Sequence, residues 1–265
     1  AVTDRLRRRR WGAEVHHHTD WGDPQSIGTG LESVLEDTAP ESRVEVVWSA
    51  GTTGMREVAD TARSADRTFA HQIDAAMAAL DGRPARIHHV SSAGALGAPS
   101  GPNRFSVGDT PYAERKAVEE QIVTATGVGR VYRVTSVFGT PRSGARSGLI
   151  GVMVLNALQS RETELYARTS TMRNYVHAAD VAEAIVRGLD VPGTEPLLLA
   201  ADRSHAMSEV VAHVAQIVRR PVPIAYRPPA NDHDMVFDAR LRSALLPQRS
   251  LPAGIRLVHD ALLTR

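Results

Sequence analysis

Tyr112 and Lys116 stand four residues apart, and Lys116 is the only lysine in the chain. Every other residue among the 31 lysines and arginines is arginine, so this position keeps an ammonium where a guanidinium is used elsewhere. Positions i and i+4 share one face of a helix, so the ammonium can approach the phenol oxygen. A nearby cation favours the phenolate form, which makes Tyr112 a candidate general acid and base. The alternative is a chance pair on a solvent-exposed helix.

Short apolar runs alternate with longer helical patterns around this pair, which predicts a parallel sheet covered by helices on both faces. Ligands bind beyond the carboxyl ends of the strands in such sheets. Ser92, Tyr112 and Ser136 each follow a strand end, so we expect them to converge there. A polar loop is expected to lead from Gly97 to Thr110. The expected strands are residues 13–19, 44–48, 86–90, 130–134, 164–167, 174–177 and 196–199, and the expected helices are residues 1–11, 27–35, 55–81, 112–126, 149–159, 179–188 and 208–219.

The composition is that of an ordinary globular protein, with 42% hydrophobic and 23% charged residues among 265. A net charge of +1 gives no global attraction to nucleic acid or to a membrane surface. The absence of cysteine excludes disulfides, thiolate metal sites and cysteine nucleophiles. No apolar run approaches the length of a membrane span, and no signal peptide is recognisable. We therefore expect a cytoplasmic protein without nucleic-acid or membrane partners.

Three polar clusters have simpler explanations than a binding site. Neighbouring side chains of a strand point to opposite faces, so at most two of His16, His17 and His18 could share a metal. The basic run at residues 7–10 fits a solvated helix end, and His233 lies in a polar loop between two aspartates. No metal site is expected.

Five segments in this order resemble the extended short-chain dehydrogenase/reductase family, which contains nucleotide-sugar epimerases, dehydratases and ketoreductases. They are Val-Ser-Ser-Ala-Gly-Ala-Leu-Gly at residues 90–97, the Tyr-x-x-x-Lys pair at residues 112–116, Arg-Val-Thr-Ser-Val-Phe-Gly-Thr-Pro at residues 133–141, Met-Arg-Asn-Tyr-Val-His-Ala-Ala-Asp-Val-Ala at residues 172–182, and the closing segment at residues 245–263.

This resemblance implies an α/β fold with a Rossmann-type, doubly wound parallel sheet and a smaller mixed α/β substrate domain. We expect the dinucleotide-binding domain at residues 1–148 and a mainly substrate-binding domain at residues 149–265, with segments around 174–190 returning to the large sheet. The family's amino-terminal strand and Gly-rich turn, which cradle the cofactor pyrophosphate, are not recognisable. We therefore expect that the sequence is an incomplete record of the natural chain. Family members often form dimers, so a homodimer is also expected.

The resemblance implies hydride transfer to or from a nicotinamide, with Ser92, Tyr112 and Lys116 as catalytic residues. Ser92 would bind the reacting substrate oxygen, Tyr112 would handle its proton, and Lys116 would hold the nicotinamide ribose. The further cofactor contacts that it implies are Asp20, Ala50, Gly51 and Val134. The choice between NAD and NADP cannot be read from these residues, although a reductase would favour NADPH.

Substrate contacts implied by the same resemblance are Ser136, Arg173 and Arg227, with the two arginines binding a diphosphate. The alternative for Arg173 is a salt bridge with Asp180 or a similar residue. His177 and Asp180 are expected to be structural residues at a strand–helix junction.

The positions that carry Asp-Glu in the family's 4,6-dehydratases hold Ala93 and Gly94, which argues against such a dehydratase. The remaining interpretation is an NAD(P)-dependent oxidoreductase that acts on a nucleotide-activated sugar. The main prediction is a dTDP-4-keto-6-deoxyhexose 4-ketoreductase. A nucleotide-sugar 4-epimerase is the alternative, and a non-catalytic NAD(P)-binding sensor or scaffold is the second alternative.

Overall fold

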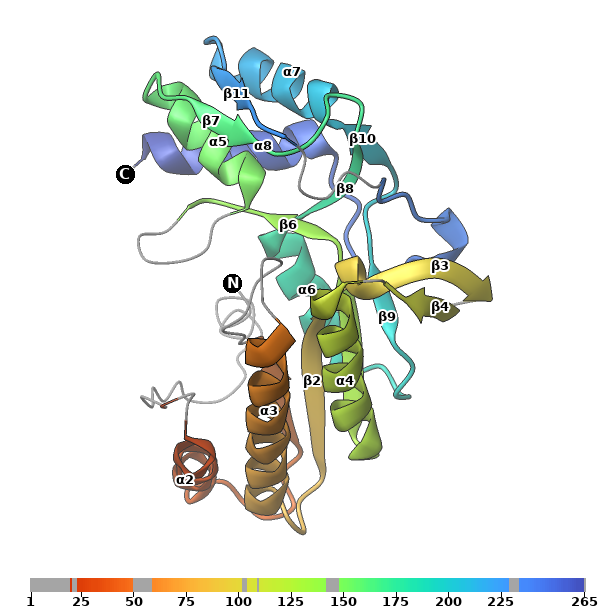
Figure 1. Cartoon of the computed structure of the whole chain (residues 1–265). Coiled ribbons are helices and arrows are strands. Elements are labelled where there is room, and N and C mark those ends of the chain that lie inside the picture. The colour runs from red at the N-terminus through yellow and green to blue at the C-terminus, as the bar shows by residue number, and fades with distance from the viewer. Residues whose placement is uncertain are drawn as a thin grey trace. The chain divides into compact units, whose positions relative to one another are not determined.

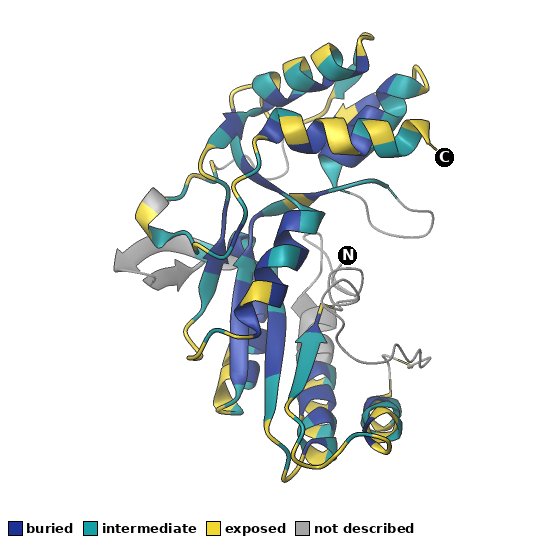
Figure 2. Ribbon diagram, turned by 180° about the vertical axis from the view of Figure 1, so that it is seen from behind, coloured by how far each residue is buried: buried dark blue, intermediate teal, exposed yellow. Residues whose placement is uncertain are grey.

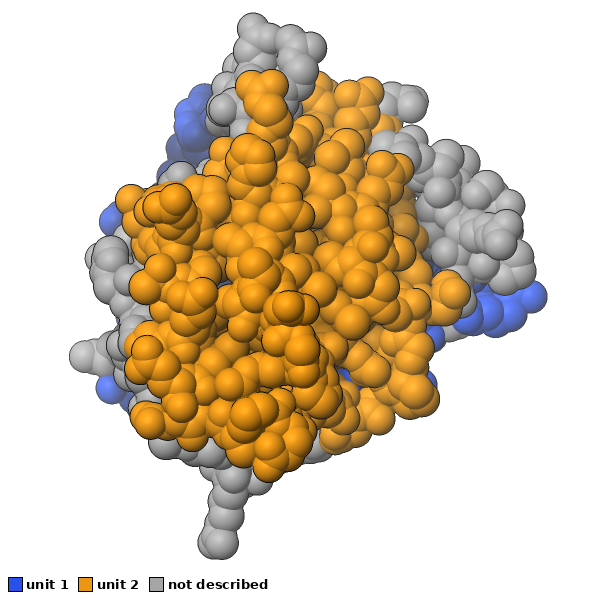
Figure 3. Space-filling view, turned by 90° about the horizontal axis from the view of Figure 1, so that it is seen from below, with its two compact units in different colours: residues 1–5, 134–188, 198–265 blue, residues 6–133, 189–197 orange. Residues whose placement is uncertain are grey.

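The computed structural model describes residues 20, 23–49, 59–101, 104–108, 110–141, 148–228 and 234–264 (Figure 1). Contacts divide the chain into two compact units, coloured separately in Figure 3. One comprises residues 6–133 and 189–197, and the other comprises residues 1–5, 134–188 and 198–265. We call them the sheet unit and the C-terminal unit. The domain boundary expected between residues 148 and 149 stays a prediction.

Several expectations fall outside the described residues. They are the helix at residues 1–11 with its basic run, the strand at residues 13–19 with its three histidines, and the single positions Ala50, Gly51 and His233.

A four-stranded sheet is built from β1 (Val44–Trp48), β2 (Ala85–Ser92), β5 (Gly129–Val134) and β9 (Leu197–Leu199), in the order β1-β2-β5-β9. β1 and β2 run parallel, with Val44 opposite Ala85 and Trp48 opposite His89. The last residues of β5 and β9 already belong to the C-terminal unit. The expected α/β class with a parallel sheet is confirmed.

In the described residues of the sheet unit, the helices are α2 (Pro24–Leu35), α3 (Ala59–Ala79) and α4 (Pro111–Ala125). α3 packs against both α2 and α4, and α4 packs against β2. Buried residues lie along the strands and on parts of the helices around them (Figure 2). One apolar cluster contains Ile73, Ile87, Trp48 and Phe69, and the rings of the last two lie edge to face with their centroids 5.8 Å apart. This packing holds the end of β2 close to the start of α4.

The segment between β2 and α4 contradicts the expectation of a polar loop. After the short 3-10 helix η1 (Ala93–Ala95), β3 (Leu96–Gly101) and β4 (Arg104–Val107) form an antiparallel pair. The pairing register shifts on both sides of Pro99, as expected for a residue that cannot donate a ladder hydrogen bond. Glycine and proline weaken the local strand signal, so this hairpin depends on the pairing itself.

The C-terminal unit contains a three-stranded sheet of order β10-β8-β6, made of β6 (Ser136–Phe138), β8 (Met172–His177) and β10 (Ser204–Ala206). β8 pairs parallel to β6 and antiparallel to β10. Thus β8 lies in this sheet, whereas β9 lies in the large one. A separate parallel pair joins β7 (Thr163–Leu165) to β11 (Ile224–Tyr226).

Four helices complete the C-terminal unit: α5 (Leu149–Leu158), α6 (Ala178–Gly188), α7 (Met207–Val218) and α8 (Leu251–Leu263). α5, α7 and α8 contact one another around a core that includes Met153, Val210 and Ile255. A second 3-10 helix, η2 (Ala239–Leu241), precedes α8. Among the helices in the described part of the chain, none has both the length and the apolarity that a membrane span requires.

Candidate active site

Ser92 is the last residue of β2 and the N-cap of η1. Its Oγ accepts a hydrogen bond from the backbone N–H of Gly94 at 3.0 Å. This bond fixes the side-chain oxygen and leaves the hydroxyl proton available to donate to another acceptor.

Gly94 lies beside the side chains of both Ser92 and Tyr112. A Cβ added at Gly94 would lie 3.2 Å from Ser92 Oγ and 3.8 Å from Tyr112 Cε1. The first contact is so short that a side chain at this position would require Ser92 to shift, so glycine permits the observed arrangement. Ser92 and Tyr112 therefore approach the same side of Gly94, a contact that sequence reasoning did not find.

Tyr112 lies in the first turn of α4, which begins as a capped helix. The Thr110 Oγ1 accepts a hydrogen bond from the Ala113 N–H at 3.1 Å, and Pro111 occupies the first helical position. Both features are favourable at a helix start, so the position of Tyr112 follows from local sequence. Its side chain is half-buried.

Lys116 is buried, with 9% of its surface exposed, so it does not lie on a solvated helix face. Its Nζ donates a hydrogen bond to Glu119 Oε2 at 2.6 Å. The Glu119 carboxylate also binds Arg115 and lies 3.4 Å from His89 Nε2. An ammonium has three N–H donors, and Glu119 takes one of them.

Burial by itself would raise the pKa of Glu119, but His89, Lys116 and Arg115 together lower it to about 2. The carboxylate is therefore ionised beside Lys116 at neutral pH. Sequence reasoning missed Glu119 because a glutamate three residues after a lysine also occurs on solvated helix surfaces.

Glu120 anchors α4 to the ends of two strands. Its Oε1 accepts a hydrogen bond from Ser91 Oγ at 2.6 Å, and its Oε2 accepts one from Arg133 at 2.7 Å. Ser91 precedes Ser92 in β2, and Arg133 lies in β5. This carboxylate thus ties the helix that carries Tyr112 to the strand that carries Ser92.

Two other predicted cofactor contacts, Asp20 and Val134, lie in the described part of the chain. Asp20 is exposed, and its backbone N–H donates to Ser26 Oγ at 3.0 Å. Val134 ends β5 and is buried. The roles of both residues stay predictions.

Ser136 and Arg173 lie in the three-stranded sheet of the C-terminal unit. Ser136 pairs with Tyr175 in register, and Arg173 stands two residues before Tyr175 in β8. Paired residues and residues two apart in a strand point to the same face, so Ser136 and Arg173 share one face of this sheet. Their position relative to Ser92 and Tyr112, in the other unit, stays a prediction.

Arg227 follows β11 in the two-stranded sheet, and its guanidinium binds Glu164 at 3.0 Å. The alternative partner considered for Arg173, Asp180, instead accepts two hydrogen bonds of 2.7 Å from Arg249. His177 Nδ1 accepts the Ala179 N–H at the start of α6. These contacts fit the expected structural roles of His177 and Asp180.

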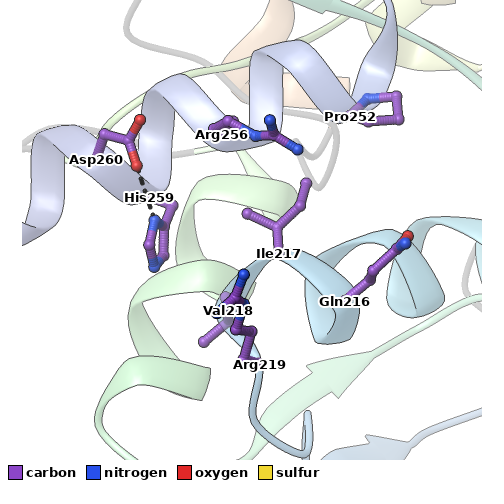
Figure 4. Close-up of a pocket in the computed structure, with 8 residues that line it drawn as sticks. All are labelled: Gln216, Ile217, Val218, Arg219, Pro252, Arg256, His259 and Asp260. Carbon is purple, nitrogen blue, oxygen red and sulfur yellow. Dashed lines mark hydrogen bonds and ion pairs between the residues drawn. The ribbon is translucent and has the colours of Figure 1, made fainter.

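A hollow of about 770 Å³ lies between the C-terminal end of α7 and the side of α8 (Figure 4). Arg219, Arg256 and His259 are among its lining residues, and His259 Nδ1 lies 2.9 Å from Asp260 Oδ1. None of the predicted site residues lines it. We assign it no part in the candidate active site.

A parallel α/β sheet with Ser92 at a strand end and Tyr112 and Lys116 at a helix start defines a short-chain dehydrogenase/reductase. The sequence model of the NAD dependent epimerase/dehydratase family matches residues 3–196, and the chain belongs to this family. The predicted enzyme class and the nicotinamide cofactor of the family are thereby confirmed. None of the curated proteins compared with the chain matches it.

Solved structures of similar fold support the Rossmann-type assignment. UDP-glucose 4-epimerase from Thermotoga maritima, solved with UDP-glucose, is 15% identical with a TM-score of 0.78 and covers 99% of this chain and 94% of its own. RMD from Pseudomonas aeruginosa, complexed with NADPH, is 17% identical with a TM-score of 0.78, covering 100% and 95%. The NAD-dependent NDP-hexosamine 5,6-dehydratase TunA is 16% identical with a TM-score of 0.70, covering 88% and 80%.

The described residues fit the nicotinamide end of such a cofactor. The Ser92 hydroxyl and the Tyr112 ring approach the same side of Gly94, and Lys116 has N–H donors besides the one given to Glu119. Ala50 and Gly51, expected further along the cofactor, lie outside the described residues.

Proposed function

We propose that the chain is an NAD(P)-dependent oxidoreductase that acts on a carbinol or keto carbon of a nucleotide-activated sugar. The observation that carries this proposal is that the Ser92 hydroxyl and the Tyr112 ring approach the same side of Gly94. A sugar oxygen bound to both side chains would meet a hydrogen-bond donor and a proton carrier together. Bound nicotinamide supplies or accepts the hydride.

Each side chain has one role in this proposal. Ser92 Oγ accepts the Gly94 N–H, so its own proton can point to the substrate oxygen and stabilise charge that develops there. The Tyr112 phenol gives its proton to that oxygen during reduction and removes it during oxidation. Lys116, oriented by Glu119, would bind the ribose hydroxyls of the cofactor.

The lack of a side chain at Gly94 supports the rejection of a 4,6-dehydratase of the Asp-Glu type. A carboxylate side chain at position 94 would begin 3.2 Å from Ser92 Oγ and would extend from there. With glycine there, no carboxylate from this position assists an elimination.

The specific activity that we propose is reduction of a dTDP-4-keto-6-deoxyhexose at C4. A 4-epimerase would use the same three residues but would keep its cofactor and return the hydride to the other face. NADPH is the proposed cofactor of the reductase. A homodimer, a cytoplasmic location and diphosphate binding by Arg173 and Arg227 belong to the same proposal.

The test is to incubate the protein with 4-keto-6-deoxy and with 4-hydroxy nucleotide sugars and to follow the absorbance of reduced nicotinamide. Consumption of one reduced nicotinamide for each product supports the reductase. Interconversion of C4 epimers without net consumption supports the epimerase. Cofactor binding without turnover of any nucleotide sugar would favour the non-catalytic alternative and overturn the proposal.

A further inference from the structure

Three metal-ligating side chains gather where β10 leads into α7 in the C-terminal unit. His205 lies in β10, and Glu209 and His213 follow at intervals of four residues along α7. His205 Nδ1 is 3.1 Å from Glu209 Oε1, and His213 Nε2 is 3.5 Å from the same oxygen. The carboxylate thus lies between two imidazoles.

The spacing explains why the three side chains meet. Glu209 and His213 are i and i+4 on one helix, so they share a face. His205 belongs to the strand that directly precedes the helix, and its extended backbone sets its ring beside the first turn. One candidate ligand atom from each residue lies within 4.8 Å of the other two.

The donor set is chemically suited to a borderline transition metal. Zinc binds imidazole nitrogen and carboxylate oxygen at about 2.0–2.2 Å and accepts three protein ligands with an open fourth position. Small rotations of Glu209 and His213, both half-buried, would bring the three atoms to the separations that a common ion requires. His205 is buried and would form the fixed part of the site.

We infer that His205, Glu209 and His213 form a binding site for a divalent transition metal ion of the zinc type. This site lies outside the candidate active site and does not depend on the proposed function. Two histidines and one carboxylate leave at least one coordination position for water.

Arg203 is the residue that opposes metal binding. Its guanidinium contacts Glu209 and lies 3.2 Å from His205 Nδ1. Its side chain is 60% exposed, and an ion pair this exposed contributes little to stability because solvent screens it. Metal binding requires Arg203 to turn into solvent, so Arg203 would lower the affinity without preventing binding.

A bound ion would stabilise β10, which pairs with the strand that carries Arg173. His205 is opposite Arg173 in the β10–β8 ladder, and Arg173 is a predicted substrate residue. Metal binding would join β10 to two turns of α7. It would thereby stabilise β10, the edge strand that pairs with the strand carrying Arg173. The expected effect is higher thermal stability of the metal-loaded protein.

The test is zinc titration of the chelator-treated full chain by isothermal calorimetry. Because His16, His17 and His18 could also bind zinc, each measurement is made in a variant with these three residues replaced by asparagine. We expect one zinc ion per chain, a loss of affinity of at least about tenfold in His213→Ala and Glu209→Gln, and no change in the control His259→Ala.

Arg203→Gln gives a second test that leaves all three ligands in place. Removing the competing cation should tighten zinc binding several-fold, and zinc should raise the melting temperature of this variant more than that of the parent. Absence of zinc binding in both proteins would overturn the inference. Unchanged affinity in correctly folded His213→Ala and Glu209→Gln, checked by circular dichroism, would overturn it as well.

Discussion

Lys116 Nζ lies 2.6 Å from Glu119 Oε2, one helical turn further along α4. The carboxylate both orients the ammonium and offsets part of its charge. His89 and Arg115 surround the same carboxylate, so Glu119 is shared among three basic groups. The orientation of the Lys116 ammonium therefore depends on Glu119, which we treat as a positioning residue.

Glu119→Gln should lower kcat by about tenfold, because Lys116 loses the carboxylate that orients its ammonium. The measurement is kcat for the proposed nucleotide-sugar reaction. Glu114→Gln, at an exposed position of the same helix, is the matched control and should keep the parent kcat. The same kcat in all three proteins would contradict the positioning role.

Glu119 should also stabilise the fold in a pH-dependent way. Its pKa is lowered from 4.5 to about 2 on folding, so its contribution is present above about pH 4.5 and is lost as the pH falls towards 2. In urea unfolding, the stability gap between the parent and Glu119→Gln should narrow from pH 6 to about pH 3. A gap that stays constant over this range would count against the ionised network.

Tyr112→Phe should reduce kcat by roughly 10²–10⁴-fold, because the proton carrier is removed while the ring remains. Binding of reduced nicotinamide, followed by its fluorescence, should persist. Tyr226→Phe, at an exposed position, is the control for loss of a phenol elsewhere in the chain. Undiminished turnover by Tyr112→Phe would refute the assignment of Tyr112.

Gly94→Ala should lower kcat/KM by about tenfold or more with little loss of stability. The new methyl group would lie 3.2 Å from Ser92 Oγ, so the hydroxyl must shift from its position beside Tyr112. Gly28→Ala is the control, since its added Cβ would make only ordinary contacts of 3.7 Å or longer. Steady-state kinetics and thermal melts distinguish a local effect from unfolding. Equal kinetics for the two variants would argue against the proposed substrate position.

Asp180→Ala should destabilise the protein by about 1–3 kcal/mol, because it removes both acceptors of the Arg249 guanidinium. Asp180 is buried, and Arg249 stands just before α8, whose position this pair secures. Asp238→Ala breaks the comparable but exposed pair with Arg240 and should leave the denaturation midpoint unchanged. Equal denaturation midpoints for both variants would show that the Asp180–Arg249 pair contributes no more to stability than the exposed Asp238–Arg240 pair.

Local signals predicted the elements that position the candidate site. The expected strands at 44–48 and 130–134 and the helix that carries Tyr112 agree with β1, β5 and α4 within a residue or two. Each of these elements carries its own pattern: an apolar run for each strand, and a Thr110 cap followed by Pro111 for the helix.

Very short strands, and contacts between residues far apart in the chain, could not be predicted from the sequence. β10 and β11 have three residues each, too few for a periodic pattern, and β3 and β4 exist through their pairing with each other. The contact of His89 with Glu119 joins β2 to α4 across thirty positions of chain. Nothing in the spacing of these two residues distinguishes them from unrelated ones. The same holds for Asp180 and Arg249.

Because Lys116 is the only lysine in the chain, amine-specific reagents can label this one side chain selectively. Reagents that acylate side-chain amines have one target in the entire chain, and that target is held by Glu119 inside the candidate site. The rate at which such a reagent modifies Lys116 would report how often this ion pair opens. Protection by added nicotinamide or nucleotide sugar would then measure occupancy of the site without any turnover assay.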